Sequence, residues 1–164
     1  MKKSLINFNF IVFLLCGTKA FSGMAIPQAG SFYPIYNSGA NQYIKPTLSM
    51  PFDKITTLYV AFAHVYPDPK FKNGAKLDFE QGQPNEPERL ANLIEIAKNK
   101  NPKIKILISL GWGKGDWDYI NKDYSIGPNN FANSVFEFIN NNKLDGLDID
   151  DESVTGISQD NFNA

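Results

Sequence analysis

Runs of hydrophobic and polar residues divide the chain into two kinds of segment. Four runs are rich in apolar, β-branched or aromatic residues and predict strands; the second is nearly continuous in such residues, which is typical of a strand buried on both faces of a parallel sheet. They cover residues 31–36, 57–65, 104–110 and 144–150. Two other stretches place apolar residues three and four positions apart, as one face of a helix does. These residues are Leu90, Leu93, Ile94 and Ala97 in the first stretch, and Phe131, Val135, Phe138 and Ile139 in the second.

The order of these segments predicts an α/β fold. Pro87 and Pro128 each stand at the start of a helical stretch, where a missing N–H is tolerated. Residues 66–86 and 111–127 are rich in glycine and polar residues, so we expect loops there. Strands that alternate with helices form parallel sheets. Two architectures fit this order: a doubly wound open sheet and the first half of a (β/α)8 barrel.

The first 20 residues differ from the rest and predict a secretory signal peptide. Lys2 and Lys3 precede an apolar run that is densest at 10–16, and Thr18-Lys19-Ala20 fits a cleavage site. A membrane anchor is the alternative, but polar residues interrupt the run before it reaches the length of about 20 that spanning requires. We therefore expect residues 21–164 to be exported, to the periplasm or the medium, with no membrane attachment after cleavage.

Composition and charge exclude several kinds of chemistry. The 164 residues are 43% hydrophobic and 20% charged, which is ordinary for a globular protein, and the formal net charge is −1. No basic stripe of the kind that binds nucleic acid is present. Cleavage after Ala20 would remove Cys16, the only cysteine, so we expect no disulfide, thiol nucleophile or cysteine-bound zinc in the mature chain.

The last apolar run carries acidic residues at alternate positions. Asp148, Asp150 and Glu152 share one face of the predicted strand, about 6.5–7 Å apart along it, while Leu147 and Ile149 point to the other face. Repulsion and burial raise the pKa of at least one member of such a group. The group can therefore supply a protonated acid near neutral pH, which cleavage of a glycosidic bond requires.

Three other interpretations fit an acidic run of this kind. A solvated surface fits poorly, because apolar residues interleave with the acids at strand spacing. A calcium loop that starts at Asp148 requires glycine and glutamate where Ser153 and Gln159 stand. A phosphatase-type nucleophile pair at Asp148 and Asp150 is conceivable at a strand end, but no magnesium-binding remainder is visible. The catalytic interpretation is favoured, with no metal.

Residues 145–152 resemble the D-G-x-D-x-D-x-E signature of glycoside hydrolase family 18, the chitinases and their relatives. The run 31–36 is similar to the family's first strand, 50–65 to its second and 104–111 to its third. Ser109 and Gly111 match the family's S-x-G-G pattern, and Trp112 replaces its second glycine. The resemblance implies a TIM-type (β/α)8 barrel. A full barrel takes about 250 residues, so we expect strands 1–4 only, an apparently truncated domain over 21–164.

The resemblance also implies a substrate-assisted retaining mechanism without a cofactor. Glu152 would be the general acid and later the base, Asp150 would orient the acetamido group of the substrate, and Asp148 would support Asp150. Asp145 and Gly146 would be structural. The implied partner is a polymer or oligomer of β-1,4-linked N-acetylglucosamine: chitin, chitooligosaccharides or the core of N-glycans.

Aromatic residues near strand ends are candidates for sugar contact, and we single out Trp112, Tyr33 and Phe62. For Trp112 and Trp117, both in the loop after the third predicted strand, sugar contact and core packing are evenly matched. His64, the only histidine, is expected to be a hydrogen-bonded core residue rather than a general base. Two alternatives to an enzyme remain open. One is a lectin-like protein that binds carbohydrate without cleaving it, and the other is an inactive truncated fragment.

Overall fold

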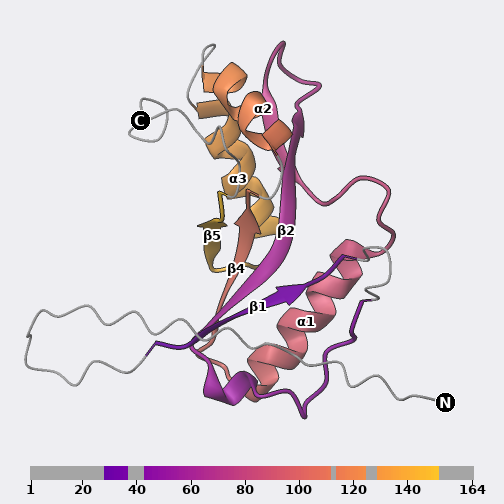
Figure 1. Ribbon diagram of the computed structural model, residues 1–164, viewed down its shortest axis with the longest axis vertical. Helices are drawn as coiled ribbons and strands as arrows, with labels where there is room; N and C mark the ends of the chain where they lie inside the picture. Colours follow the sequence, from indigo (N-terminus) through magenta and orange to yellow (C-terminus); the bar gives the residue numbers. More distant parts are fainter. Residues whose placement is uncertain (1–27, 37–42, 112–113, 125–128, 152–164) are drawn as a thin grey trace, which may run out of the picture.

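A computed structural model describes residues 28–36, 43–111, 114–124 and 129–151 (Figure 1). The predicted signal peptide, Trp112, the start of the second predicted helix at Pro128, and Glu152 lie outside the described residues. The elements are, in chain order, β1 (Gly30–Pro34), the 3-10 turn η1 (Phe52–Lys54), β2 (Thr57–Pro67), β3 (Ala75–Asp78), α1 (Glu86–Lys100), β4 (Lys105–Leu110), α2 (Lys114–Tyr124), α3 (Asn129–Asn141) and β5 (Gly146–Ile149).

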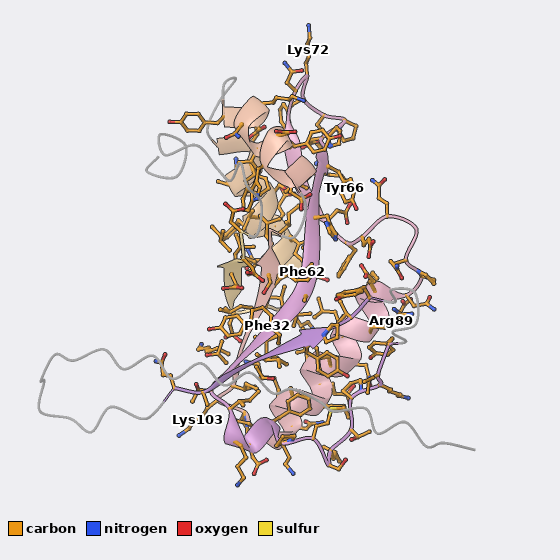
Figure 2. The ribbon with its side chains drawn as sticks, in the orientation of Figure 1. Phe32, Phe62, Tyr66, Lys72, Arg89 and Lys103 are labelled. Atoms are coloured by element: carbon orange, nitrogen blue, oxygen red, sulfur yellow. The ribbon has the colours of Figure 1, made fainter. Side chains whose placement is uncertain are left out.

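The sheet confirms the predicted α/β class. Its strands run β1-β2-β4-β5, and all three of these pairings are parallel. β3 is the exception, because it pairs antiparallel with the end of β2 and forms a hairpin. Figure 2 shows Lys72 at the tip of this hairpin. The four predicted strands are confirmed, with ends that differ by a few residues.

One face of the sheet is sealed by the helices. Leu58 and Val60 on β2 and Ile106 and Ile108 on β4 alternate onto this face, and each is at most 1% exposed. They form one apolar cluster with side chains from α1, α2 and α3. Burying an aliphatic side chain of this size stabilises a fold by about 1.5–3 kcal/mol. The apolar residues in the two strand segments had indicated this burial.

The helix α1 confirms the predicted stripe, since Leu90, Leu93 and Ala97 are at most 1% exposed and Ile94 packs against the cluster. The helix ends where Asn101 donates from Nδ2 to the carbonyl oxygens of Phe52 and Ile55, at 3.2 and 3.0 Å. These bonds join the end of α1 to the turn η1 that precedes β2. The face predicted for the second helix is confirmed in α3, whose side chains Phe131, Val135, Phe138 and Ile139 all contact the cluster.

Two expected loops contain regular structure, so those predictions were wrong in part. The segment 111–127 includes α2, whose Trp117 is fully buried and whose Ile120 is 8% exposed. These two residues lie three positions apart and face the core. The segment 66–86 includes β3, which forms because the end of β2 offers it a partner strand.

Side chains from α2 and α3 bond to the backbone of the β2–β3 hairpin. Asp123 accepts hydrogen bonds from the N–H of Ala75 at 3.0 Å and of Phe131 at 2.9 Å. Ser134 Oγ accepts one from Leu77 N–H at 2.7 Å. Backbone groups that would otherwise be buried without a partner are thereby satisfied, and the hairpin is held against the helices.

The second face of the sheet carries no described helix. Phe32 on β1 pairs in register with Tyr59 on β2, their rings stack at 5.0 Å, and Phe32 is 48% exposed. This face is called the inner face below, because it would face the interior of a closed barrel. Among the described residues, no helix is long and apolar enough to cross a membrane.

Candidate active site

The candidate site lies where β4 and β5 end side by side on the inner face. Parallel pairing places Ser109 directly opposite Asp148 and Leu110 opposite Ile149. Ser109 Oγ donates a hydrogen bond of 2.8 Å to Asp148 Oδ2, and the serine is fully buried. A residue of the S-x-G-G pattern and one of the acidic motif, 39 positions apart in the chain, therefore contact each other directly.

The backbone of the next residues continues this junction. The N–H of Asp150 donates to the carbonyl oxygen of Leu110 at 2.7 Å, so the second acid of the motif is attached to the end of β4. Gly111 has φ +137°, and a Cβ at this position would lie 2.1 Å from the carbonyl oxygen of Asp150. Only glycine fits there, because it accepts this φ and leaves room for the neighbouring strand.

Asp145 lies at the other end of β5 and acts as an anchor. Its Oδ2 accepts hydrogen bonds from the N–H of Ile106 at 2.9 Å and from Lys98 Nζ at 2.8 Å, while Lys105 Nζ bonds to Oδ1 at 3.0 Å. Burial alone would raise the pKa of Asp145, but these bonds outweigh it and lower that pKa to about 2. The residue is ionised in the native protein and fixes the start of the acidic strand.

Gly146 and the residues that follow complete the strand. A Cβ on Gly146 would lie 3.1 Å from Leu107 Cδ2, which is tighter than ordinary packing. Alternation then places Gly146, Asp148 and Asp150 on the inner face. Leu147 contacts the core on the other face, as expected, but Ile149 is 47% exposed. Glu152, the predicted general acid, lies outside the described residues.

Two aromatic residues, one just after β1 and one in β2, stack near the candidate site. Tyr36 lies 6.1 Å from Phe62 between ring centroids. Figure 2 shows Phe62 midway along β2. Phe62 stands at the register shift between Ala61, which pairs with Ser109, and Ala63, which pairs with Leu110, so it lies beside the end of β4. An apolar platform of two rings therefore lies beside the strand end that bonds to Asp148.

Tyr33, a predicted sugar contact, lies elsewhere. It is 8% exposed and belongs to the core cluster, and its hydroxyl donates to the carbonyl oxygen of Ile44. Burial, together with the neighbouring Tyr43, raises the pKa of this phenol. Because Tyr33 alternates with Phe32, its side chain lies on the face opposite Asp148. The structure thus brings Asp148, Ser109, Gly111 and the backbone of Asp150 together, but not Tyr33.

Sequence reasoning assigned no role to Asp116. Asp116 belongs to α2, which was not predicted, so no signal pointed to its burial. Among the described residues, no three His, Cys, Asp or Glu side chains are arranged to hold a metal ion.

Comparison with known proteins supports one family. The family model described as "Glycosyl hydrolases family 18" matches residues 32–164. This match confirms the resemblance predicted from the acidic motif. No match was found among curated proteins.

Solved structures agree with this family on the fold. A substituted GH18 chitinase of Cycas revoluta in complex with (GlcNAc)4 is similar at 26% identity and TM-score 0.56, over 76% of this chain and 34% of that one. A class V chitinase from Nicotiana tobaccum is similar at 19% identity and TM-score 0.55, over 76% and 32%. Human YKL-39, described as a pseudo-chitinase with retained chitooligosaccharide binding, is similar at 24% identity and TM-score 0.52, over 74% and 32%.

These structures identify the parallel sheet as part of a TIM-type barrel, as predicted, and exclude the doubly wound alternative. The chain spans about a third of the length of the solved structures that it matches.

Proposed function

The chain belongs to glycosyl hydrolases family 18, and from that premise we propose that the protein hydrolyses β-1,4-linked N-acetylglucosamine oligomers or polymers with Glu152 as general acid. The observation that carries the proposal is the bond between Ser109 Oγ and Asp148 Oδ2 at the end of two paired strands. The buried serine holds this carboxylate in one orientation, as the proposed support of Asp150 by Asp148 requires.

The proposed mechanism assigns a different task to each acid. Glu152 protonates the departing glycosidic oxygen, and the acetamido carbonyl of the substrate attacks its own anomeric carbon. Asp150 orients that acetamido group and stabilises the cationic intermediate. Asp148, fixed by Ser109, supports Asp150 through a shared proton. Water then attacks the intermediate with Glu152 as base.

The aromatic residues near the candidate site support a sugar rather than a small anion as substrate. Tyr36 and Phe62 offer stacked rings beside the end of β4, and aromatic faces pack well against the apolar faces of pyranose rings. Chitinases among the similar structures were solved with NAG4 and (GlcNAc)4. Trp112, directly after Gly111, is proposed as a further sugar contact. Export through the signal peptide at residues 1–20 would bring the protein to such polymers.

The test is the variant Glu152→Gln, assayed with chitotetraose. We expect hydrolysis to fall at least about 100-fold, since general acid catalysis contributes that much, while binding measured by calorimetry changes little. The matched control is Glu88→Gln, on an exposed position of α1, which should keep both. If Glu152→Gln cleaved chitotetraose at near-native rate, the assignment of the acid would be wrong.

A second candidate is carbohydrate binding without hydrolysis. A pseudo-chitinase that retains chitooligosaccharide binding is among the similar structures. Binding of chitotetraose by the unsubstituted protein, with no product after long incubation, would favour this candidate over the first.

A further inference from the structure

An enclosed group of ionisable side chains lies beside the candidate site, where β2 passes the end of β4. Ala63 on β2 pairs with Leu110, the last residue of β4, and His64 follows it. The imidazole Nδ1 of His64 lies 3.4 Å from Asp116 Oδ2 in the first turn of α2. Their side chains are 14% and 8% exposed, so the pair is largely shielded from water.

Asp116 joins α2 to β2 through both carboxylate oxygens. Oδ1 accepts a hydrogen bond from Val65 N–H at 2.9 Å, and Oδ2 faces the imidazole. Figure 1 shows α2 beside the upper part of β2. The helix α2 follows β4 in the chain. Its attachment to β2 through Asp116 therefore also holds the end of β4 next to β2.

The paired ends of β2 and β4 also contact the acidic motif. Leu110, which pairs with Ala63, accepts the hydrogen bond from Asp150 N–H, and the preceding Ser109 bonds to Asp148. His64 is therefore connected to the backbone of Asp150 through the strand pair Ala63 and Leu110.

The electrostatics favour a charged pair. Asp116 from α2, Glu86 from α1 and Glu80 from the segment before α1 all act on His64, and Tyr66 on the same strand lies 6.4 Å from it between ring centroids. Burial alone would lower the pKa of His64, but the bond to Asp116 and the three carboxylates raise it above 6.5. The ion pair is therefore complete below that pKa and is lost as the pH rises through it.

We propose that His64 and Asp116 are positioning residues for the acidic motif, which hold the ends of β2 and β4 in the register that Asp148 and Asp150 require. The expected effect on the rate of hydrolysis rests on the proposed function, whereas the effect on the register of β2 and β4 does not. In this proposal both residues act through β2 and β4. Their contribution is to the geometry of the reacting groups, where a displacement of about 1 Å can cost up to about 100-fold in rate.

The first test is the variant Asp116→Asn, which keeps the size of the side chain and an acceptor for Val65 N–H but removes the charge. The matched control is Asp118→Asn, two residues away and exposed on the same helix. His64 is the only histidine in the sequence, so its imidazole can be titrated by NMR without ambiguity. We expect the pKa of His64 to fall in Asp116→Asn and to stay unchanged in Asp118→Asn.

The positioning role is read from two further measurements. Amide hydrogen exchange at Asp150 should accelerate about tenfold in Asp116→Asn, because its acceptor Leu110 is less firmly held. The kcat for chitotetraose should fall about tenfold in Asp116→Asn with KM within about twofold, because the reacting groups are displaced while the sugar contacts remain. The variant His64→Gln should show the same loss of kcat with the same small change in KM.

The outcomes separate this inference from the proposed function. If Asp150 exchange and kcat in Asp116→Asn both match the Asp118→Asn control while the pKa of His64 falls, the pair only stabilises the fold and the inference is overturned. If the unsubstituted protein forms no product, the proposed function falls, and exchange at Asp150 alone then decides whether the pair positions the motif.

Discussion

Neutralising Asp145 is the perturbation whose cost can be worked out most fully from the structure. The variant Asp145→Asn keeps the size of the side chain and an oxygen that can accept from Ile106 N–H, but it removes the charge that binds Lys98 and Lys105. The pKa of Asp145 falls from its ordinary 3.8 to about 2 in the folded protein. At about 1.4 kcal/mol for each pH unit, full linkage would give an upper limit of roughly 2.5 kcal/mol.

Solvent reduces this upper limit. The side chain of Asp145 is 19% exposed and that of Lys105 is 66% exposed, so water screens part of the attraction. We therefore expect Asp145→Asn to lower the free energy of unfolding by about 1–2 kcal/mol at pH 7. Since the native pKa is depressed, the stability from the charge is present above pH 3.8 and is lost as the pH falls toward 2.

The assay is urea unfolding followed by circular dichroism at pH 7 and again near pH 2. The difference between the variant and the unsubstituted protein should be about 1–2 kcal/mol at the higher pH and should shrink strongly at the lower one. Asp118→Asn, exposed on α2, serves as control and should change stability by less than about 0.5 kcal/mol at either pH. An equal loss for Asp145→Asn at both pH values would refute the reasoning, because the cost would then not come from the charge.

Three further predictions concern the site and its support. Ser109→Ala removes the donor to Asp148 and should slow chitotetraose hydrolysis about tenfold or more, since a bond to a charged group contributes about 1.5–3 kcal/mol; unchanged kcat would show that Asp148 needs no such partner. Gly111→Ala should cost more than about 3 kcal/mol in urea unfolding, while Gly82→Ala, also at positive φ but in open space, should cost about 1 kcal/mol; equal costs would contradict the predicted clash with Asp150. Arg89→Lys should lower the free energy of unfolding by about 1 kcal/mol, because the Arg89 guanidinium donates to the carbonyl oxygen of Ile35 and lies 4.7 Å from the centre of the Tyr43 ring. An unchanged free energy of unfolding would mean that a positive charge at this position is enough for stability.

The strands and the acidic motif could be predicted because their signals are local. A continuous apolar run predicts a buried strand whatever its neighbours are, and alternation alone assigns Asp148 and Asp150 to one face. The sequence also indicated that Ser109 forms a hydrogen bond at a strand end, but its partner, Asp148 on the neighbouring strand, is known only from the structure.

The elements that were missed depend on distant partners. β3 is only four residues long and contains no β-branched residue, so its propensity for strand is weak. It forms because β2 pairs with it, and because Asp123 and Ser134, about 50 residues away, bond to its N–H groups. The helix α2 begins with Lys114-Gly115, and glycine disfavours helix. Its stability comes from Trp117 in the core, which local spacing does not reveal.

Tyr33 shows a different kind of error. Its place near a strand end suggested sugar contact, but neighbouring residues on a strand point to opposite faces. Phe32 takes the inner face, so Tyr33 enters the core.

The order of the parallel strands bears on how the chain folds during its synthesis. β1, β2, β4 and β5 lie side by side in the order in which the ribosome makes them, and the first paired residues of successive strands are 27, 48 and 39 positions apart. At about 5–20 residues per second, each new strand emerges within about 1–10 seconds of the strand it will pair with. Each later strand therefore finds the strand it pairs with already made. The unpaired backbone N–H and C=O groups at the edges of β1, β2 and β4 are covered as the next parallel strand of the order is synthesised.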